Sequence, residues 1–177
     1  SKRSHWTALN SVYEDPEKWV KEGKHDFGVP MMYYADELFF PFVEDWKSRT
    51  NGRFIIPGLG VYQVDEKEGN WNPVKIKEQI QFCRENQMEG NAFYRSRFLT
   101  DNKKGILDEI KNNFYDHPAL LPTLSWLETI RPIYPVNVKA IRAGMYMSLS
   151  WDQTLQPDNK EVFYNVYRSK TWPIDAY

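Results

Sequence analysis

The sequence has few of the residues that build metal sites and disulfides. Its 177 residues include one cysteine, Cys83, and three histidines that lie far apart. A single cysteine cannot form an internal disulfide, and no Cys/His cluster has the spacing of a structural zinc site. The stretch 57–60 also lacks the further residues of a dinucleotide- or phosphate-binding glycine loop. We therefore expect no metal and no cofactor.

The sequence also lacks an excess of either charge and any long apolar run. The 23 basic and 24 acidic residues leave a formal net charge of -1, which disfavours nucleic acid as a partner. No apolar stretch approaches the roughly 20 residues that cross a bilayer, and the first residues do not begin a signal peptide. We expect no membrane span, and the location of this chain is unknown from its sequence.

Aromatic residues are abundant instead. They make up 16% of the chain, with seven Trp and eleven Tyr, although the mean hydropathy is only -0.68. Aromatic faces stack on the apolar C–H faces of sugar rings while polar groups hold the hydroxyls, so this composition fits carbohydrate binding. Most individual aromatic residues could equally fill a core.

Strand patterns alternate with helix patterns through the first two thirds of the chain. Asp15 and Asn72 each precede a proline in the way that a helix cap does. The predicted helices span residues 16–22, 41–48, 73–86, 104–113 and 119–127. The predicted strands span residues 27–34, 53–62 and 90–98. Because these strands are apolar almost throughout, they indicate a parallel sheet that is covered on both faces.

From Pro132 onward the pattern is all-β. Three β-rich runs, at 136–141, 145–151 and 163–168, are separated by turn residues and show no helical period. Three strands are too few to close a sandwich of about seven. We therefore predict one domain over residues 1–131 and a truncated β-module over residues 132–177.

The first region resembles the family-ten-like glycosyl hydrolases, bacterial proteins with a TIM-barrel catalytic domain. The resemblance covers roughly residues 13–126 and rests on the order and spacing of five segments, which are 13–23, 30–34, 57–62, 93–98 and 118–122. It implies an α/β fold in which the chain supplies the last three strand–helix units of a TIM (β/α)8 barrel. It also implies a parent glycoside hydrolase that acts on a bacterial or dietary polysaccharide.

The second region is similar to the opening strands of fibronectin-type-III modules. The matching segments are 135–138, 147–152 and 164–169. This resemblance implies that Trp151 and either Tyr164 or Tyr167 pack in a sandwich core. The fold expected for the whole chain is thus the end of a barrel followed by a partial fibronectin-type-III-like module.

Glycoside hydrolysis generally needs two carboxyl groups that flank the scissile bond. In a TIM barrel they project from the carboxyl ends of the strands, where this sequence offers only the adjacent pair Asp36 and Glu37. Adjacent loop residues diverge, and Asp36 could equally cap the next turn. The family resemblance implies that the catalytic acid and nucleophile lie upstream, so we expect the isolated chain to be inactive.

The same strand ends supply candidate substrate-binding residues. These candidates are Tyr33, Tyr34, Tyr62, Trp71 and Arg95. Strand alternation allows only one of Tyr33 and Tyr34 to face the barrel, and it does not decide between Arg95 and Arg97. Trp71 could stack on a sugar or pack ahead of the following helix.

Two other functions fit the sequence. The chain could be a non-catalytic carbohydrate-binding or structural module, or a small α/β enzyme of another class. The partner expected is a carbohydrate, and three unclosed parallel strands predict self-association through uncovered edges. The parent protein is expected to be exported to the periplasm, the cell surface or the medium.

Overall fold

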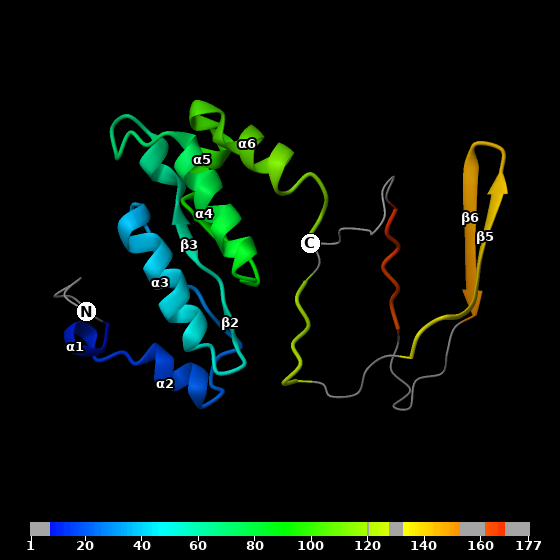
Figure 1. The fold of residues 1–177 in the computed structure, drawn as a ribbon, viewed down its shortest axis with the longest axis horizontal. Helices are drawn as coiled ribbons and strands as arrows, with labels where there is room; N and C mark the ends of the chain where they lie inside the picture. The colour runs from blue at the N-terminus through cyan, green and yellow to red at the C-terminus, as the bar shows by residue number, and fades with distance from the viewer. Residues whose placement is uncertain (1–7, 120, 128–132, 153–161, 169–177) are drawn as a thin grey trace. The chain divides into compact units, whose positions relative to one another are not determined.

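The computed structural model describes residues 8–119, 121–127, 133–152 and 162–168. The chain divides into two compact units, Ser1–Pro122 and Thr123–Tyr177. The first unit contains parallel strands and helices, and the second contains an antiparallel hairpin (Figure 1).

Four short strands and one bridge of the first unit form three parallel segments, 27–31, 54–60 and 92–94, which pair in chain order. Strand β1 (Phe27–Gly28) is parallel to β2 (Phe54–Ile55), and β3 (Gly58–Gly60) is parallel to β4 (Ala92–Tyr94). A parallel bridge between Met31 and Gly58 joins the two pairs. The prediction of parallel strands is therefore confirmed for these segments.

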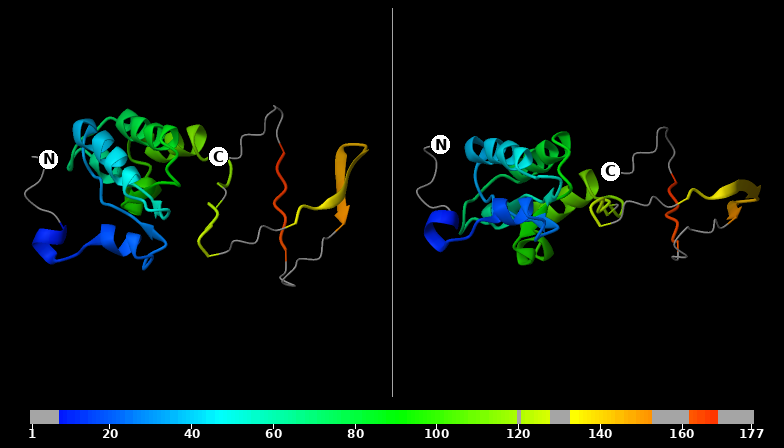
Figure 2. Two further views of the ribbon diagram at one scale, coloured as in Figure 1. Left: turned by 60° about the horizontal axis from the view of Figure 1, so that its bottom comes forward. Right: turned by 90° about the horizontal axis from the view of Figure 1, so that it is seen from below.

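Helices lie before, between and after the strand segments of this unit. They are α1 (Ala8–Val12), α2 (Pro16–Lys21), α3 (Asp36–Ser48), α4 (Pro73–Glu85), α5 (Ser96–Thr100) and α6 (Ile106–Asn113), with 3₁₀ turns η1 (Val61–Val64) and η2 (Lys103–Gly105). Helices α3 and α4 connect one segment to the next. They lie side by side, and α4 packs on β3 (Figures 1 and 2).

Two predicted helix starts are confirmed by their caps. The Asp15 carboxylate accepts a hydrogen bond from the Lys18 N–H at 3.0 Å, and the Asn72 side chain accepts one from the Val74 N–H at 3.0 Å. Each cap satisfies a backbone donor that the first turn of a helix leaves unpaired.

Helix α3 begins earlier than predicted. It starts at Asp36, so Pro41 lies inside the helix and not in its first turn. Proline removes one hydrogen bond within a helix. Burial of Phe39 and Val43, which are both 0% exposed and four residues apart, offsets that loss.

Two predicted strands end sooner than expected because helical turns follow them directly. Tyr62 lies in η1, where the spacing of Val61 and Val64 buries both side chains. The third strand stops at Tyr94, and Phe98 is buried from α5. Arg97 therefore lies on a helix.

Two short predicted elements are wrong in the residues that the structure describes. Residues 121–124 have no regular secondary structure and 125–127 form a turn, where the sequence predicted a helix over 119–127. Pro118 and Pro122 interrupt helical hydrogen bonding there. Residues 163–168, predicted as a strand, also have no regular structure.

The core of the first unit lies between one face of the strands and the helices. Met32, Ile55 and Leu59 point to this covered face, and each is at most 1% exposed. The buried cluster consists of Met32, Phe39, Val43, Leu59, Val61, Val64, Ile76, Ile80, Cys83, Phe98, Ile106 and Ile110.

The opposite face of the first strand line is exposed. Phe27, Val29 and Met31 alternate with covered positions, and the Met31 side chain is 67% exposed. We call these three residues the open sheet face. Alternation along a strand places them on the same side of the sheet.

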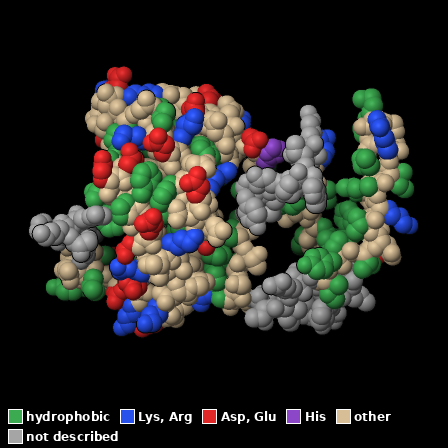
Figure 3. Space-filling model, viewed as in Figure 1, with side chains coloured by type: hydrophobic (Ala, Val, Ile, Leu, Met, Phe, Trp, Pro, Cys, Tyr) green, Lys and Arg blue, Asp and Glu red, His purple; other side chains and the backbone are tan. Residues whose placement is uncertain are grey.

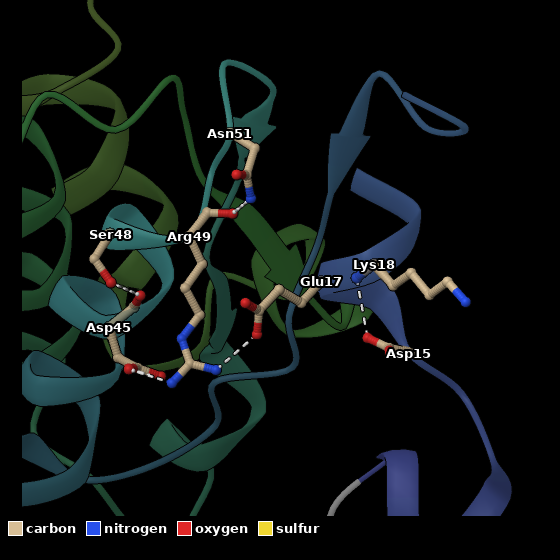
Figure 4. Close-up of polar contacts among 7 residues, drawn as sticks. All are labelled: Asp15, Glu17, Lys18, Asp45, Ser48, Arg49 and Asn51. Carbon is tan, nitrogen blue, oxygen red and sulfur yellow. Dashed lines mark hydrogen bonds and ion pairs between the residues drawn. The ribbon is translucent and has the colours of Figure 1, made fainter. Parts of the chain in front are cut away.

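Arg49 ties α2 to the end of α3 (Figure 4). Its guanidinium contacts the Glu17 carboxylate at 2.9 Å and the Asp45 carboxylate at 2.8 Å. Hydrogen bonds to these carboxylates raise the pKa of Arg49. The contact fixes the segment that leads into β1.

The second unit contains a two-stranded antiparallel hairpin. Strand β5 (Val136–Ala143) pairs with β6 (Tyr146–Asp152), which confirms two of the predicted β-runs. The rings of Trp151 and Tyr164 meet edge to face at 5.5 Å. Most apolar side chains of the hairpin are exposed, as Met147 is at 62%.

Candidate functional site

Three tyrosine rings meet in the first unit, and we call them the tyrosine cluster. The rings of Tyr33 and Tyr94 are stacked, with 5.2 Å between their centres and 11° between their planes. Tyr62 meets both rings edge to face, at 5.8 Å from each. Such ring pairs stabilise one another by about 0.5–1.5 kcal/mol beyond the area that they bury.

The cluster lies at the carboxyl ends of three neighbouring parallel segments. Tyr33 follows the bridge at Met31, Tyr62 follows β3, and Tyr94 is the last residue of β4. Because parallel strands end on the same side of a sheet, residues far apart in the sequence converge there. This edge is where open parallel sheets and TIM barrels bind their ligands.

Two glycines in β3 make room for the cluster. A Cβ atom on Gly60 would lie 3.0 Å from the Tyr33 Cβ and 3.2 Å from the Tyr62 Cε1. A Cβ on Gly58 would lie 2.8 Å from the Pro30 carbonyl oxygen and 3.4 Å from the Tyr33 ring. The glycine pair therefore allows Tyr33 to lie directly over β3.

The three rings differ in exposure. Tyr94 is 49% exposed, whereas Tyr33 and Tyr62 are half-buried. Burial raises the pKa of Tyr33, and the neighbouring Tyr94 and Tyr62 raise it further. Both phenols that flank Tyr33 are thus close enough to disfavour its ionised form.

Tyr62 and Trp71 are connected through Gln63. The Gln63 side-chain amide donates to the Tyr62 hydroxyl at 3.1 Å, and the Gln63 backbone carbonyl accepts from the Trp71 backbone N–H at 2.7 Å. The Trp71 side chain is partly buried against the core, and the Lys75 ammonium lies 5.8 Å from its ring centre. Trp71 therefore packs at the start of α4 while its backbone holds the loop after η1.

Tyr34 has different surroundings from Tyr33. Its ring lies 5.5 Å from that of Phe42, and its carbonyl accepts from the Gln79 side chain at 2.9 Å. Of the two adjacent tyrosines, the structure brings only Tyr33 into the cluster.

Arg95 and Arg97 are both exposed and paired with acidic residues. Arg95 lies 3.5 Å from the Glu68 carboxylate and 5.1 Å from the centre of the Phe98 ring. Arg97, in α5, contacts Asp101, the residue that follows this helix, at 3.4 Å. Arg95 directly follows Tyr94 in the chain, so it is the arginine adjacent to the cluster in sequence.

A hollow of about 580 Å³ opens between the loop after η1 and the segment after β4. Acidic and basic side chains line it in equal number, and a contact of 3.4 Å between Lys103 and Asp65 crosses it. Its lining residues are Val64, Asp65, Glu66, Lys67, Glu68, Arg97, Phe98, Asp101, Lys103 and Lys104. Its lining residues follow Tyr62 and Tyr94 in the chain, and none of the three cluster tyrosines is among them.

Asp36 and Glu37 do not form a pair of equivalent carboxylates. The Asp36 carboxylate accepts from the Lys75 ammonium at 3.0 Å, and this hydrogen bond raises the pKa of Lys75. Glu37 is exposed. Asp36 is thus held by a basic partner on α4, as its position in the first turn of α3 allows.

Tyr94 was missed as a candidate binding residue. The sequence predicts a strand over residues 90–98, which places the strand end at Arg95–Arg97 and not at Tyr94. Pairing the third strand with the Gly58–Gly60 segment would have placed its end correctly, because Gly60 is the register partner of Tyr94. Gln79, a fully buried polar residue on α4, gave no comparable signal in the sequence.

The described part of the chain shows neither a group of metal ligands nor a membrane-spanning helix. Within residues 8–119, 121–127, 133–152 and 162–168, no three His, Cys, Asp or Glu side chains gather as metal ligands would. No helix in those ranges has the length and apolar character needed to cross a membrane.

The chain is similar to one protein of known assignment, Glycosyl hydrolase YngK of Bacillus subtilis (strain 168). The two are 24% identical over 174 residues, which cover 91% of this chain and 34% of that protein. The chain is a distant relative of a glycosyl hydrolase. It spans about a third of the length of the curated relative it matches. No family model and no solved structure matches the chain.

Proposed function

We propose that this chain is the C-terminal part of a glycoside hydrolase barrel and supplies one wall of its sugar cleft. The observation that carries the proposal is the tyrosine cluster at the carboxyl ends of three adjacent parallel segments. The distant similarity to a glycosyl hydrolase supports the same class of protein. The proposed parent acts on a bacterial or dietary polysaccharide.

The barrel itself is part of the proposal. Three parallel segments in chain order, joined by helices on the covered face, are what consecutive units of a (β/α)8 barrel require. The open sheet face supports this fold, because in a closed barrel such side chains fill the interior. We assign the segments to strands six to eight of a family-ten-like glycosyl hydrolase.

The hairpin of the second unit fits the start of a fibronectin-type-III-like module. Its two antiparallel strands carry Trp151, whose ring meets that of Tyr164 edge to face. Aromatic contacts of this kind support the packing expected between strands of such a sandwich.

The cluster suits a pyranose ring because one of its aromatic faces is accessible. Tyr33 covers one face of Tyr94, and about half of Tyr94 remains exposed. A sugar can stack its C–H face on the outer side of Tyr94 while the Arg95 guanidinium donates to a hydroxyl. The acidic and basic side chains that line the hollow after η1 and β4 can hold further hydroxyls. Side chains of both charges are spread over the face of the first unit that Figure 3 shows.

The catalytic carboxylates are proposed to lie upstream in the parent protein. Asp36 is bound by Lys75, and Glu37, the other candidate carboxylate, is exposed. A parent with paired carboxylates on earlier strand ends would complete the two-carboxyl mechanism. The chain alone then binds sugar without hydrolysing it.

Hydrolysis assays test this division of labour. Chitohexaose, cellohexaose and xylohexaose are incubated with the 177-residue chain and with the parent protein. We expect turnover only by the parent. Turnover by the chain that is lost on Asp36→Asn or Glu37→Gln would place catalysis here and contradict the proposal. A parent that binds these sugars without cleaving any glycan would favour a non-catalytic carbohydrate-binding module.

A further inference from the structure

Helix α4 holds the segment that carries Tyr33 by two polar contacts. Gln79 donates from its side chain to the Tyr34 carbonyl at 2.9 Å. Lys75 donates to the Asp36 carboxylate at 3.0 Å. Lys75 and Gln79 are four residues apart on α4, so they lie on the same face of that helix.

Gln79 is an unusual residue for this position. It is 0% exposed in a cluster of apolar side chains, and its Oε1 atom has no partner among the described residues. An unpaired buried acceptor costs about 1–3 kcal/mol. An apolar side chain of similar size would avoid that cost, so stability alone does not account for glutamine here.

The contacts of Gln79 and Lys75 complete the restraints around Tyr33. On the preceding residue, the Met32 N–H donates to the Gly58 carbonyl at 3.0 Å. On the following residues, α4 holds Tyr34 and Asp36. The ring of Tyr33, which has these anchors on both sides, lies over Gly60 and stacks on Tyr94.

We infer that Gln79 and Lys75 are positioning residues that set the place of Tyr33 in the tyrosine cluster. Their link to sugar binding rests on the proposed function, whereas their effect on the geometry of the cluster does not. Neither side chain belongs to the cluster itself, so each acts through the backbone or the carboxylate that it holds.

The test reads the cluster geometry without any sugar. Ring protons of Tyr94 lie in the ring-current field of Tyr33, so their NMR shifts report the stacking. In Gln79→Met and Lys75→Met chains we expect these resonances to move downfield. Gln79→Met should keep a urea unfolding midpoint close to that of wild type, because the unpaired Oε1 leaves the core.

Two matched variants separate positioning from general effects on α4. Lys75→Arg keeps a cation beside Asp36 and should restore the wild-type shifts. Lys77→Met removes an ion pair on the same helix, between Lys77 and Glu109 at 2.8 Å, and should leave the Tyr94 resonances unchanged. The inference is overturned if the Tyr94 resonances do not move in Gln79→Met and Lys75→Met. It is also overturned if they move as far in Lys77→Met as in those two variants.

Sugar affinity is measured in a second experiment, apart from the NMR shifts. Affinity for chitohexaose, cellohexaose and xylohexaose is measured in parallel, and the variants with displaced Tyr33 should bind several-fold more weakly. If the wild-type chain binds none of these probes, the proposed function is wrong while the NMR shifts still decide the positioning roles. If Gln79→Met does not fold, the Lys75→Met and Lys75→Arg pair decides them.

Discussion

The ring of Tyr33 lies parallel to that of Tyr94, and Gly60 is the residue that permits the contact. Gly60 is the register partner of Tyr94 in the paired strands, and a Cβ on it would lie 3.0 Å from the Cβ of Tyr33. Because Gly60 has no side chain, the tyrosine rings at three strand ends can come into contact. The proposed sugar-binding wall depends on that arrangement.

Gly60→Ala should disrupt the cluster. The added methyl group is too close to Tyr33 and Tyr62, and such overpacking typically costs about 1–3 kcal/mol. Urea unfolding followed by circular dichroism measures the loss. Gly90→Ala is the matched control, because a Cβ at Gly90 meets no atom within 4 Å. Equal stability of the two variants would argue against a packed cluster.

Tyr94→Ala should weaken sugar binding more than it weakens folding. Its ring is about half exposed, and the loss of one stacking contact of about 1 kcal/mol corresponds to roughly fivefold in affinity. Isothermal titration of the chain with chitohexaose, cellohexaose and xylohexaose checks the effect. Tyr13→Ala, at a residue that is 89% exposed and outside the cluster, should bind as wild type does. A similar loss in both variants would contradict the role of Tyr94.

Cys83 predicts a loss of stability at alkaline pH. Burial raises the pKa of its thiol from 9.0 to about 11, so the folded state favours the neutral form. The raised pKa contributes fully to the free energy of unfolding below pH 9, and this contribution is lost as the pH rises to about 11. The loss amounts to roughly 3 kcal/mol, at about 1.4 kcal/mol for each pKa unit of the shift. Urea unfolding at pH 8 and pH 11 measures it. Cys83→Val, which keeps the other titrating groups, should show a smaller fall, and an equal fall would refute the assignment.

The open sheet face predicts self-association of the isolated chain. Phe27, Val29 and Met31 form an exposed apolar strip beside an unclosed strand, and such surfaces pair between molecules. Sedimentation velocity should detect concentration-dependent oligomers that Met31→Lys reduces. Val74→Lys, an exposed apolar position on α4, should leave them unchanged. A wild-type chain that sediments as a monomer at all concentrations would argue against this role of the open sheet face.

The parts of the fold that the sequence predicted are those governed by local signals. Asp15 and Asn72 cap helices as their side chains and the following prolines indicated. The start of α3 was mispredicted because Pro41 is a strong local signal, whereas burial of Phe39 depends on tertiary packing. The ends of the strands were misplaced for the same reason, since buried residues of η1 and α5 follow them directly.

The candidate site was predictable in part. Tyr33 and Tyr62 were selected because parallel strands end together, and the structure brings their rings to 5.8 Å. Tyr94 could not be added without the strand register, which the sequence does not contain. The contact between Gln79 and the Tyr34 carbonyl joins residues 45 positions apart, and neither residue type signals its partner.

The most direct test is an NMR titration of the chain, with its tyrosine rings labelled, against chitohexaose, cellohexaose and xylohexaose. The ring resonances of Tyr33, Tyr62 and Tyr94 are assigned by Tyr→Phe substitution. We predict saturable shifts at Tyr94, with smaller shifts at Tyr33 and Tyr62, for at least one of these sugars. Saturable binding that moves other tyrosines and leaves these three unchanged, or no binding of any of the sugars, would contradict the account.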